Sequence, residues 1–451
     1  MSKTEKRQKI GFGEKFAYGL GDCSANIYVA LSGTFLTGYY TDTLGIAAAA
    51  IATMMLIGRI FDGFTDLAMG VVVDKTRSRF GKARPWVLWT APLMGLGLIA
   101  MFTVPGNLGS KGKLVYAYIS YIIMNCIIYT ANNLPYNALL SRMTFDVQDR
   151  IDTSAMRFIM TQVTSLAINI ATTKLLPTMG WSKLVIIYGI ISTAMLLICF
   201  AGCKEHIGEN ESEGTVEVEK VPIKEGLIAM SKNKYFYLQT ALFCLTFMMI
   251  VSNGMMGFYY SSYILNDFQF LSIISIANTV PAIALNFIIP KFASKLGKRN
   301  LMIIGSLLVM LGSCVIGLSA GGKSVVIAGL ILRACGICPI STCVFALTAD
   351  VVDYGEWKNG IRTEGIINSC TSFGMKIGIG LGSAIGGWIL AFGCYDGSLA
   401  VQSSRALCAI DFGFSWLGAI LAGLCLVVIL FMNLDKSMPQ IQKDLEIKHS
   451  I

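Results

Sequence analysis

Arg59, Asp62 and Asp66 lie within the segment IGRIFDGFTDLAMG, which is flanked by the apolar runs AAAAIATMML and VVV. On a helix, their spacings of three and four residues place the side chains on one face. A charge near the bilayer centre costs at least ~2.5–3.5 kcal/mol, so these carboxylates are expected to face a cavity or another helix. Because two neighbouring carboxylates cannot both ionise cheaply, we predict that Asp62 and Asp66 bind a cation, either Na⁺ or H⁺. The structural alternative is a buried Arg59–Asp ion pair that only joins helices.

A second polar group lies in the apolar segment NCIIYTANNLPYNALLSR. Its amides and phenols, with one threonine and one cysteine, form two helical stripes: Asn125, Tyr129, Asn132 and Tyr136, then Cys126, Thr130, Asn133 and Asn137. Amides and phenols suit sugar hydroxyls, which both donate and accept hydrogen bonds. The alternative for any one of these residues is a hydrogen bond between helices.

Three further polar positions lie in apolar segments. Asn26 is a candidate for a cavity, whereas Asp22 follows glycines and is expected to cap the start of a helix. Lys376 lies deep in a segment and must meet an anion, and Thr371 precedes it by about one turn. Arg333 is less deep, so snorkelling to the membrane surface is an open alternative.

The elements that carry these residues are predicted to be membrane-spanning helices. The chain has 451 residues, of which 54% are hydrophobic and 14% charged, with a mean hydropathy of +0.64. Its apolar runs approach the ~20 residues that cross a bilayer. We predict an all-α polytopic membrane protein with twelve transmembrane helices, at 20–41, 47–73, 85–104, 114–140, 155–177, 183–203, 235–263, 269–290, 300–319, 324–349, 364–392 and 409–433.

The polar stretch between the sixth and seventh segments divides the chain into two halves. We predict an N-terminal six-helix bundle (1–203), a cytoplasmic central loop (204–234), a C-terminal six-helix bundle (235–435) and a cytoplasmic tail (436–451). Each half carries a basic–x–Gly–Lys element after its second segment, centred on Gly81 and Gly297. Two six-span repeats suggest the major facilitator fold, in which the substrate site lies at the interface of the halves.

The distribution of Lys and Arg predicts the orientation. Most of the 36 basic residues lie in the N-terminus, the tail and alternate loops; the other loops contain Lys111, Lys113, Lys174, Lys183, Lys323 and Arg405. The positive-inside rule therefore places both termini in the cytoplasm. On that side, acidic and basic residues of the two halves could form a gate: Asp74, Arg79, Arg142, Asp350, Asp353 and Glu356. Simple solvation of a charged surface is the alternative.

Two motifs resemble functional sites without their context. The glycines of GIGLGSAIGG follow no strand; Gly378, Gly382 and Gly386 are spaced by four residues, which favours close helix packing. The pair Cys335 and Cys338 has redox or zinc spacing but stands alone in a span.

The motifs RIFDGFTD…TRSRFGKARPW, YTANNLPYNAL and ADVVDYGEWKNGIRTEG resemble the glycoside–pentoside–hexuronide:cation symporters, the melibiose-carrier branch of the major facilitators. The resemblance covers nearly the whole chain and implies sugar–cation symport by alternating access. It implies cation binding by Asp62, Thr65, Asp66 and Thr130. It also suggests substrate contacts by Asn26, Tyr129, Asn133, Asn137, Arg157 and Lys376, and we include Thr371 because it lies about one turn before Lys376.

The chain departs from melibiose carriers at three of these positions. Melibiose carriers have aspartates where this chain has Asn26 and Asn133, and a tryptophan in place of Asn137. Losing two acids while Arg157 and Lys376 stay basic favours an acidic or neutral ligand. The segments GDCSAN, NNLPYNAL and IRTEG also resemble the glucuronide carriers more than the melibiose carriers, whereas VDYGEWKNG resembles the pentoside carriers. We therefore predict a glucuronide or other hexuronide as substrate, with a pentoside such as a xyloside, or another neutral oligosaccharide, as the alternative.

The remaining expectations concern class and partners. No nucleophile–base set or histidine lies in the spans, so we expect a transporter and not an enzyme. A sugar sensor of the same fold is the more remote alternative. We expect no cofactor besides the coupling ion, no nucleic-acid partner, and a monomer in a bacterial cytoplasmic membrane that binds a small sugar or glycoside.

Overall fold

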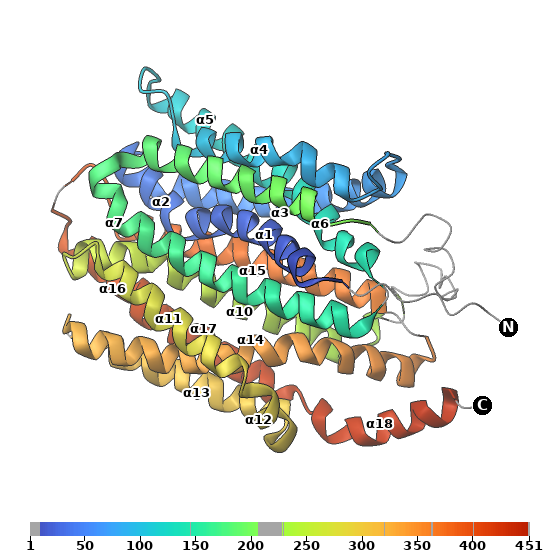
Figure 1. Ribbon diagram of the computed structural model, residues 1–451. Coiled ribbons are helices and arrows are strands. Elements are labelled where there is room, and N and C mark those ends of the chain that lie inside the picture. Colours follow the sequence, from blue (N-terminus) through green and yellow to red (C-terminus); the bar gives the residue numbers. More distant parts are fainter. Residues whose placement is uncertain are drawn as a thin grey trace. The chain divides into compact units, whose positions relative to one another are not determined.

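The computed structural model describes residues 10–144, 146–205, 228, 230–319, 321–361, 364–399 and 401–449. The elements within these ranges are helices joined by turns (Figure 1), so the all-α prediction is confirmed there. The chain divides into two compact units. One contains residues 1–46 and 57–217, and the other contains residues 47–56 and 218–451. Most of the predicted central loop, namely residues 206–227 and 229, lies outside the described residues.

The first unit follows the order of the N-terminal predicted spans. Its elements are α1 (Phe12–Ala30), η1 (Leu31–Phe35), α2 (Leu36–Gly38), η2 (Tyr39–Thr43), most of α3 (Ala48–Lys75), α4 (Arg84–Phe102), α5 (Ser110–Ile122), η3 (Ile123–Tyr129), α6 (Thr130–Met143) and α7 (Val147–Gly202), where η denotes a π-helical segment. Helix α7 contains two predicted spans. They meet at Gly180, which has a φ of 70°, and the chain reverses its direction there (Figure 1). Only glycine adopts that conformation without strain.

The second unit also follows the order of its predicted spans, and it has an additional helix, α18, after the last one. Its elements are α10 (Lys234–Tyr259), η4 (Tyr260–Ile264), α11 (Phe270–Asn286), α12 (Ile289–Leu296), α13 (Lys298–Gly317), α14 (Lys323–Asn359), α15 (Glu364–Phe392), α16 (Ser404–Asp411), η5 (Phe412–Trp416), α17 (Leu417–Phe431) and α18 (Leu434–His449). Helix α18 covers the described part of the predicted tail, and Leu434, Met438, Ile441 and Leu445 of this helix are buried.

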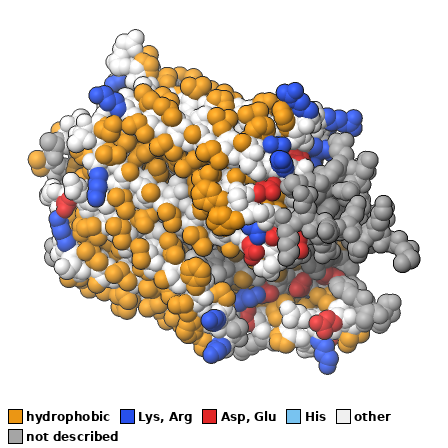
Figure 2. Space-filling model, in the orientation of Figure 1, with side chains coloured by type: hydrophobic (Ala, Val, Ile, Leu, Met, Phe, Trp, Pro, Cys, Tyr) orange, Lys and Arg blue, Asp and Glu red, His pale blue; other side chains and the backbone are white. Residues whose placement is uncertain are grey.

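Eight helices among the described residues are long and apolar enough to cross a membrane. The other predicted spans are also helical. The first is a continuous helical run from α1 to η2, the second is the charged helix α3, and the eighth is the shorter apolar α11. The fifth and sixth predicted spans are both contained in α7, so the eight helices account for nine of the twelve predicted spans. On the face in Figure 2, apolar side chains cover most of the helix surface and basic side chains lie near the ends, as lipid contact requires.

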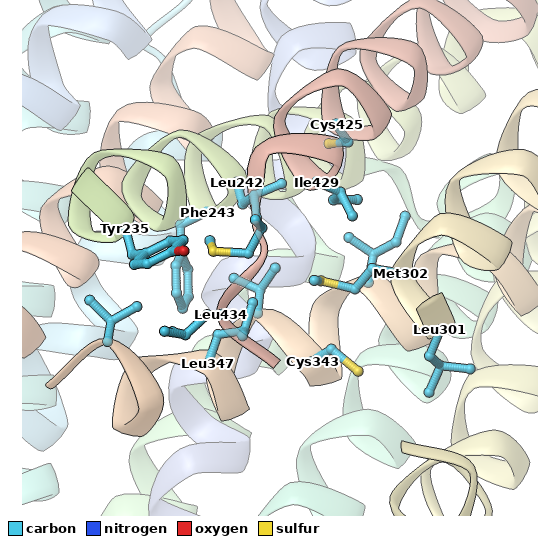
Figure 3. Packing of buried hydrophobic residues seen from close by; sticks show 14 of the residues in the cluster. Tyr235, Leu242, Phe243, Leu301, Met302, Cys343, Leu347, Cys425, Ile429 and Leu434 are labelled. Atoms are coloured by element: carbon cyan, nitrogen blue, oxygen red, sulfur yellow. The ribbon is translucent and has the colours of Figure 1, made fainter. Parts of the chain in front are cut away.

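The core of the second unit joins helices that are distant in the sequence. Figure 3 shows Leu242 and Phe243 of α10, Met302 of α13, Leu347 of α14 and Ile429 of α17 packed together. Each of these side chains is at most 1% exposed. Sequence-distant spans are therefore held in one bundle, on which α18 packs through Leu434 and its buried neighbours.

Candidate functional site

The carboxylate of Asp62 lies in a buried polar contact in the first unit. Its side chain is 1% exposed. Thr130 of α6 donates a hydrogen bond to Asp62 Oδ1 over 2.9 Å, and Arg59 Nη1 lies 3.6 Å from Asp62 Oδ2. The spacing of α3 thus brings Arg59 and Asp62 to one face, and α6 brings Thr130 to that face. The arrangement contains a carboxylate, a hydroxyl and one counter-charge.

The other two cation candidates lie on the same helix. Thr65 donates its hydroxyl hydrogen to the backbone carbonyl of Asp62 over 3.1 Å. Its oxygen keeps lone pairs that can coordinate a cation. Asp66 follows Asp62 by about one helical turn and is partly buried. These positions place four oxygen-bearing side chains on two facing helices.

Three tyrosines surround Arg59, and two of them, Tyr28 and Tyr121, were not among the predicted site residues. The guanidinium interacts electrostatically with Tyr28, Tyr121 and Tyr129, and Tyr121 forms a side-chain hydrogen bond with it. Gly58 makes this approach possible, because a Cβ at Gly58 would collide with the Tyr121 ring. The available signal was the spacing of Tyr121 and Tyr129 in one segment; nothing local marked Tyr28.

A second cluster joins α1, α6 and α7. Arg157 Nε lies 3.4 Å from Asp22 Oδ2, and Arg157 Nη1 donates to Asn137 Oδ1 over 2.8 Å. The amide of Asn137 donates in turn to Asn133 Oδ1 over 3.1 Å, while Asn26 donates to the backbone carbonyl of Asp22 over 3.1 Å. Four of the predicted sugar contacts therefore lie in one hydrogen-bonded group.

The prediction that Asp22 caps a helix start is wrong. Helix α1 begins at Phe12 with Gly11 as its N-cap, so Asp22 lies inside the helix. Its carboxylate is held there by the charge of Arg157 instead of by backbone N–H groups. The glycines before Asp22 suggested a helix start, but Gly19 and Gly21 are buried under the Met160 and Tyr136 side chains.

The remaining amides of α6 and η3 join helices. Asn132 donates to Thr90 Oγ1 of α4 over 2.7 Å, and Asn125 Oδ1 accepts from the Tyr28 hydroxyl over 2.8 Å. The Tyr136 ring stacks on Tyr18 with centroids 4.5 Å apart. Asn125 and Asn132 therefore form hydrogen bonds between helices, which was the alternative to a role in sugar binding. Tyr129, by contrast, lies against Tyr28 at 5.1 Å and near Arg59.

In the second unit, Thr371 and Lys376 lie on α15. The Thr371 hydroxyl donates to the Ile367 carbonyl over 2.6 Å, and Lys376 is partly buried. Arg333 does not reach the membrane surface, because it is 1% exposed. It donates to the Phe414 carbonyl over 2.8 Å and to Asn253 Oδ1 over 2.5 Å.

Two of the predicted gate residues, Arg142 and Asp350, form ion pairs inside their own units. Arg142 Nη1 lies 3.8 Å from Glu205 Oε2, and Lys298 Nζ lies 2.6 Å from Asp350 Oδ2. The other gate candidates are Arg79, which is exposed, Asp353, which is partly buried, and Glu356, which is buried. The side chain of Asp74 lies outside the described residues.

Comparison with known proteins identifies relatives along the whole chain. A family model described as MFS/sugar transport protein matches residues 17–436. The isoprimeverose transporter of Lactiplantibacillus pentosus is 32% identical over 98% of this chain and 93% of its own length. The glucuronide carrier protein homolog of Escherichia coli (strain K12) is 29% identical over 97% and 96%.

Solved structures share the fold at low sequence identity. A crystal structure of the nucleoside transporter NupG is 16% identical and covers 92% of this chain and 98% of its own, with a TM-score of 0.62. A POT family transporter in complex with 5-aminolevulinic acid is 13% identical and covers 96% and 99%, with a TM-score of 0.65.

Proposed function

Because this chain belongs to the MFS/sugar transport protein family, we propose that it is a symporter that carries a glycoside inward together with Na⁺ or H⁺. The observation that carries the coupling proposal is the Asp62 carboxylate, buried in a membrane helix between Arg59 and Thr130. A buried carboxylate is costly unless a positive charge compensates it. A coupling cation beside Asp62 would supply such a positive charge.

The proposed cation site consists of Asp62, Thr65, Asp66 and Thr130. With Arg59 Nη1 at 3.6 Å from Asp62 Oδ2, the existing pair is longer than a strong charge-assisted hydrogen bond. A Na⁺ beside the oxygens, or a proton on one carboxylate, would compensate the second acid. Cation and sugar together would then permit the change of access from one side of the membrane to the other. The coupling ion is the only cofactor proposed.

The polar cluster of the first unit supports a neutral glycoside as substrate. The positive charge of Arg157 in this cluster is compensated by the carboxylate of Asp22. The amides of Asn133 and Asn137 beside it are uncharged. Such a set can donate to and accept from sugar hydroxyls without a net charge. Similarity to the isoprimeverose transporter agrees with this, since isoprimeverose is an uncharged disaccharide that contains xylose. We therefore propose a xylose-containing or other neutral glycoside.

A glucuronide is the second candidate. Lys376 keeps a basic group in α15 that could meet a carboxylate, and one relative is named a glucuronide carrier homolog. We prefer a neutral glycoside because the positive charge of Arg157 has an acidic partner, Asp22, in the structure. Asn26, Tyr129, Thr371 and Lys376 complete the proposed substrate contacts.

Uptake into proteoliposomes tests both proposals. Radiolabelled isoprimeverose, a simple xyloside and a glucuronide would each be offered under an imposed Na⁺ gradient, an imposed H⁺ gradient, or neither. We expect the neutral glycosides to accumulate only with one of the gradients. Gradient-driven uptake of the glucuronide alone would reverse the substrate order, and equilibration without accumulation under both gradients would contradict symport.

The setting of this function is also proposed. We place the chain in a bacterial cytoplasmic membrane as a monomer with both termini in the cytoplasm, in agreement with the distribution of Lys and Arg. A sugar sensor of the same fold is the alternative, and it would bind the glycoside without accumulating it.

A further inference from the structure

A carboxylate that follows α7 caps the start of α4. Glu205 accepts backbone hydrogen bonds from Lys82 over 3.2 Å and from Ala83 and Arg84 over 2.8 Å each. The first N–H groups of a helix lack partners within the helix, and the N-cap residue of α4, Ala83, offers no side-chain acceptor. The Glu205 side chain, 7% exposed, supplies that acceptor from a distant part of the sequence.

Arg84 makes the reverse contact. Its Nη2 donates to the Phe200 carbonyl in the last turn of α7 over 2.8 Å, and its guanidinium lies 4.6 Å from the centroid of the Phe200 ring. Carbonyls at a helix C-terminus lack partners and carry partial negative charge. Each helix end is therefore capped from the other helix. We call Glu205 and Arg84 the first clasp.

The second unit repeats this arrangement. Asp435, in the first turn of α18 and four residues after the end of α17, accepts from the backbone N–H of Arg299 over 2.7 Å. The Arg299 side chain donates to the carbonyls of Leu430 over 2.8 Å and Ile429 over 3.3 Å in the last turns of α17. In both units the acid lies five residues after a carbonyl that the arginine binds, namely Phe200 or Leu430. Asp435 and Arg299 form the second clasp.

The glycine of each repeated basic element fits its clasp. Gly81 has a φ of 102° and Gly297 a φ of 81°, both in the region that side chains disfavour. A Cβ at Gly81 would collide with the Glu205 carboxylate, and one at Gly297 would lie 3.1 Å from Asp435 Oδ2. The basic–x–Gly–Lys elements therefore have a structural use in both units.

A charged residue at the end of the fourth span joins each clasp region. In the first unit Arg142 of α6 pairs with Glu205 itself. In the second unit Asp350 of α14 pairs with Lys298, the residue beside Arg299. The signs of the charges are exchanged, but in each unit the third, fourth and sixth spans are linked at the same end.

We propose that the two clasps are matched positioning elements of the transport cycle, an inference that rests on the proposed function. Each clasp holds the spans of its own half together at the end predicted to face the cytoplasm, so that the half reorients as one body. Glu205 and Asp435 follow the last spans of their halves, whereas the proposed cation and sugar contacts lie within spans. Loss of a clasp therefore slows reorientation and leaves ligand affinity unchanged.

Kinetics of Glu205→Ala and Asp435→Ala in proteoliposomes test the proposal. We expect the maximal uptake rate to fall by roughly tenfold or more in both, with the sugar KM within about twofold of wild type. Glu205→Gln is the matched control, since its amide oxygen still accepts from Ala83 and Arg84, and we expect less than about a threefold loss of rate. Gly81→Ala should behave like Glu205→Ala, because its methyl group displaces the carboxylate.

Two readouts separate the clasp from general damage and from the proposed function. Acetate added at the clasp side should restore part of the rate of Glu205→Ala, because the free N–H groups can bind it. Faster hydrogen exchange at the Lys82–Arg84 amides is expected in Glu205→Ala without any sugar. If wild type transports no glycoside, the proposed function fails while the exchange result still reports on the clasp. Wild-type rates in both alanine variants, or a raised KM at an unchanged rate, would overturn the positioning role.

Discussion

At Asp62, a single carboxylate is expected to link the cation to transport. It accepts a hydrogen bond from Thr130 and faces Arg59, and its side chain is almost fully buried. Asp62→Asn keeps the shape but removes the charge. We expect this variant to lose accumulation of sugar under both cation gradients and to retain exchange of sugar between the two sides. Uphill uptake at the wild-type level in Asp62→Asn would contradict the cation site.

Thr130 offers a narrower test of the same site. Thr130→Val is close in shape but cannot donate to Asp62 Oδ1, whereas Thr130→Ser keeps the hydroxyl. A hydrogen bond to a charged group contributes ~1.5–3 kcal/mol, so removing it is expected to change the apparent cation affinity by roughly tenfold or more. The serine variant should stay near wild type. The measurement is the cation concentration for half-maximal uptake, and equal values for both variants would remove Thr130 from the site.

The pair formed by Asp22 and Arg157 predicts non-additive effects. Removing one partner of a mostly buried ion pair leaves an uncompensated charge, which costs more than removing both. We expect Asp22→Asn and Arg157→Gln each to lower sugar uptake strongly, and the double variant to recover part of it. Uptake of a neutral glycoside is measured for wild type, the two single variants and the double variant, which together form a double-mutant cycle. Purely additive losses of uptake would contradict a coupled pair.

These two sites differ in how far the sequence could predict them. Arg59 and Asp62 are close in the sequence, so helical spacing alone places them on one face. Asp22 and Arg157 lie on different helices, α1 and α7, and their contact depends on how those helices pack. Local signals at Asp22 pointed to a helix cap because neighbouring glycines are common at helix ends. Here those glycines serve close packing instead.

Among the elements, the glycine-rich face of α15 was correctly predicted to be a packing surface. A Cβ at Gly378 would collide with the Cys244 carbonyl of α10, and one at Gly382 would lie 2.7 Å from the Met248 carbonyl. Gly382→Ala is therefore expected to separate α15 from α10 and to lower thermal stability of the purified protein by several degrees. Gly423→Ala in α17 is the matched control, because no atom lies within 4 Å of its Cβ position. Equal melting temperatures for the two variants would contradict this reading.

The order of the spans was predictable from apolar length, but their irregularities were not. The break in α7 at Gly180 falls between the predicted spans 155–177 and 183–203. The π-helical segments η3 and η5, in contrast, have no signature in the sequence. In η5, Phe414 turns its carbonyl to Arg333, a contact that neither residue's neighbours indicate. A side chain from another helix stabilises this carbonyl, so the irregularity is a property of the bundle.

For the whole molecule, the prediction of a sugar transporter of the major facilitator class is confirmed by the family model over residues 17–436 and by the relatives that span the chain. Two parts of the organisation were not foreseen. Residues 47–56, which include the start of α3, group with the second unit, and there Gly387 of α15 packs on Ala52. The tail forms α18, where Trp357 of α14 donates to Asp444 over 2.9 Å.

The orientation of the molecule can be tested with a native thiol. Cys394 follows α15, is exposed, and belongs to a loop predicted to lie outside the cytoplasm. A membrane-impermeant maleimide should therefore label intact cells, and Cys394→Ser should remove that label. Cys408 of α16 is also exposed, so both proteins are compared in a Cys408→Ser background. Lys443→Cys in α18 provides the opposite control, because the positive-inside rule predicts labelling only after permeabilisation. Labelling of Lys443→Cys, but not of Cys394, in intact cells would invert the topology and with it the predicted direction of the clasps.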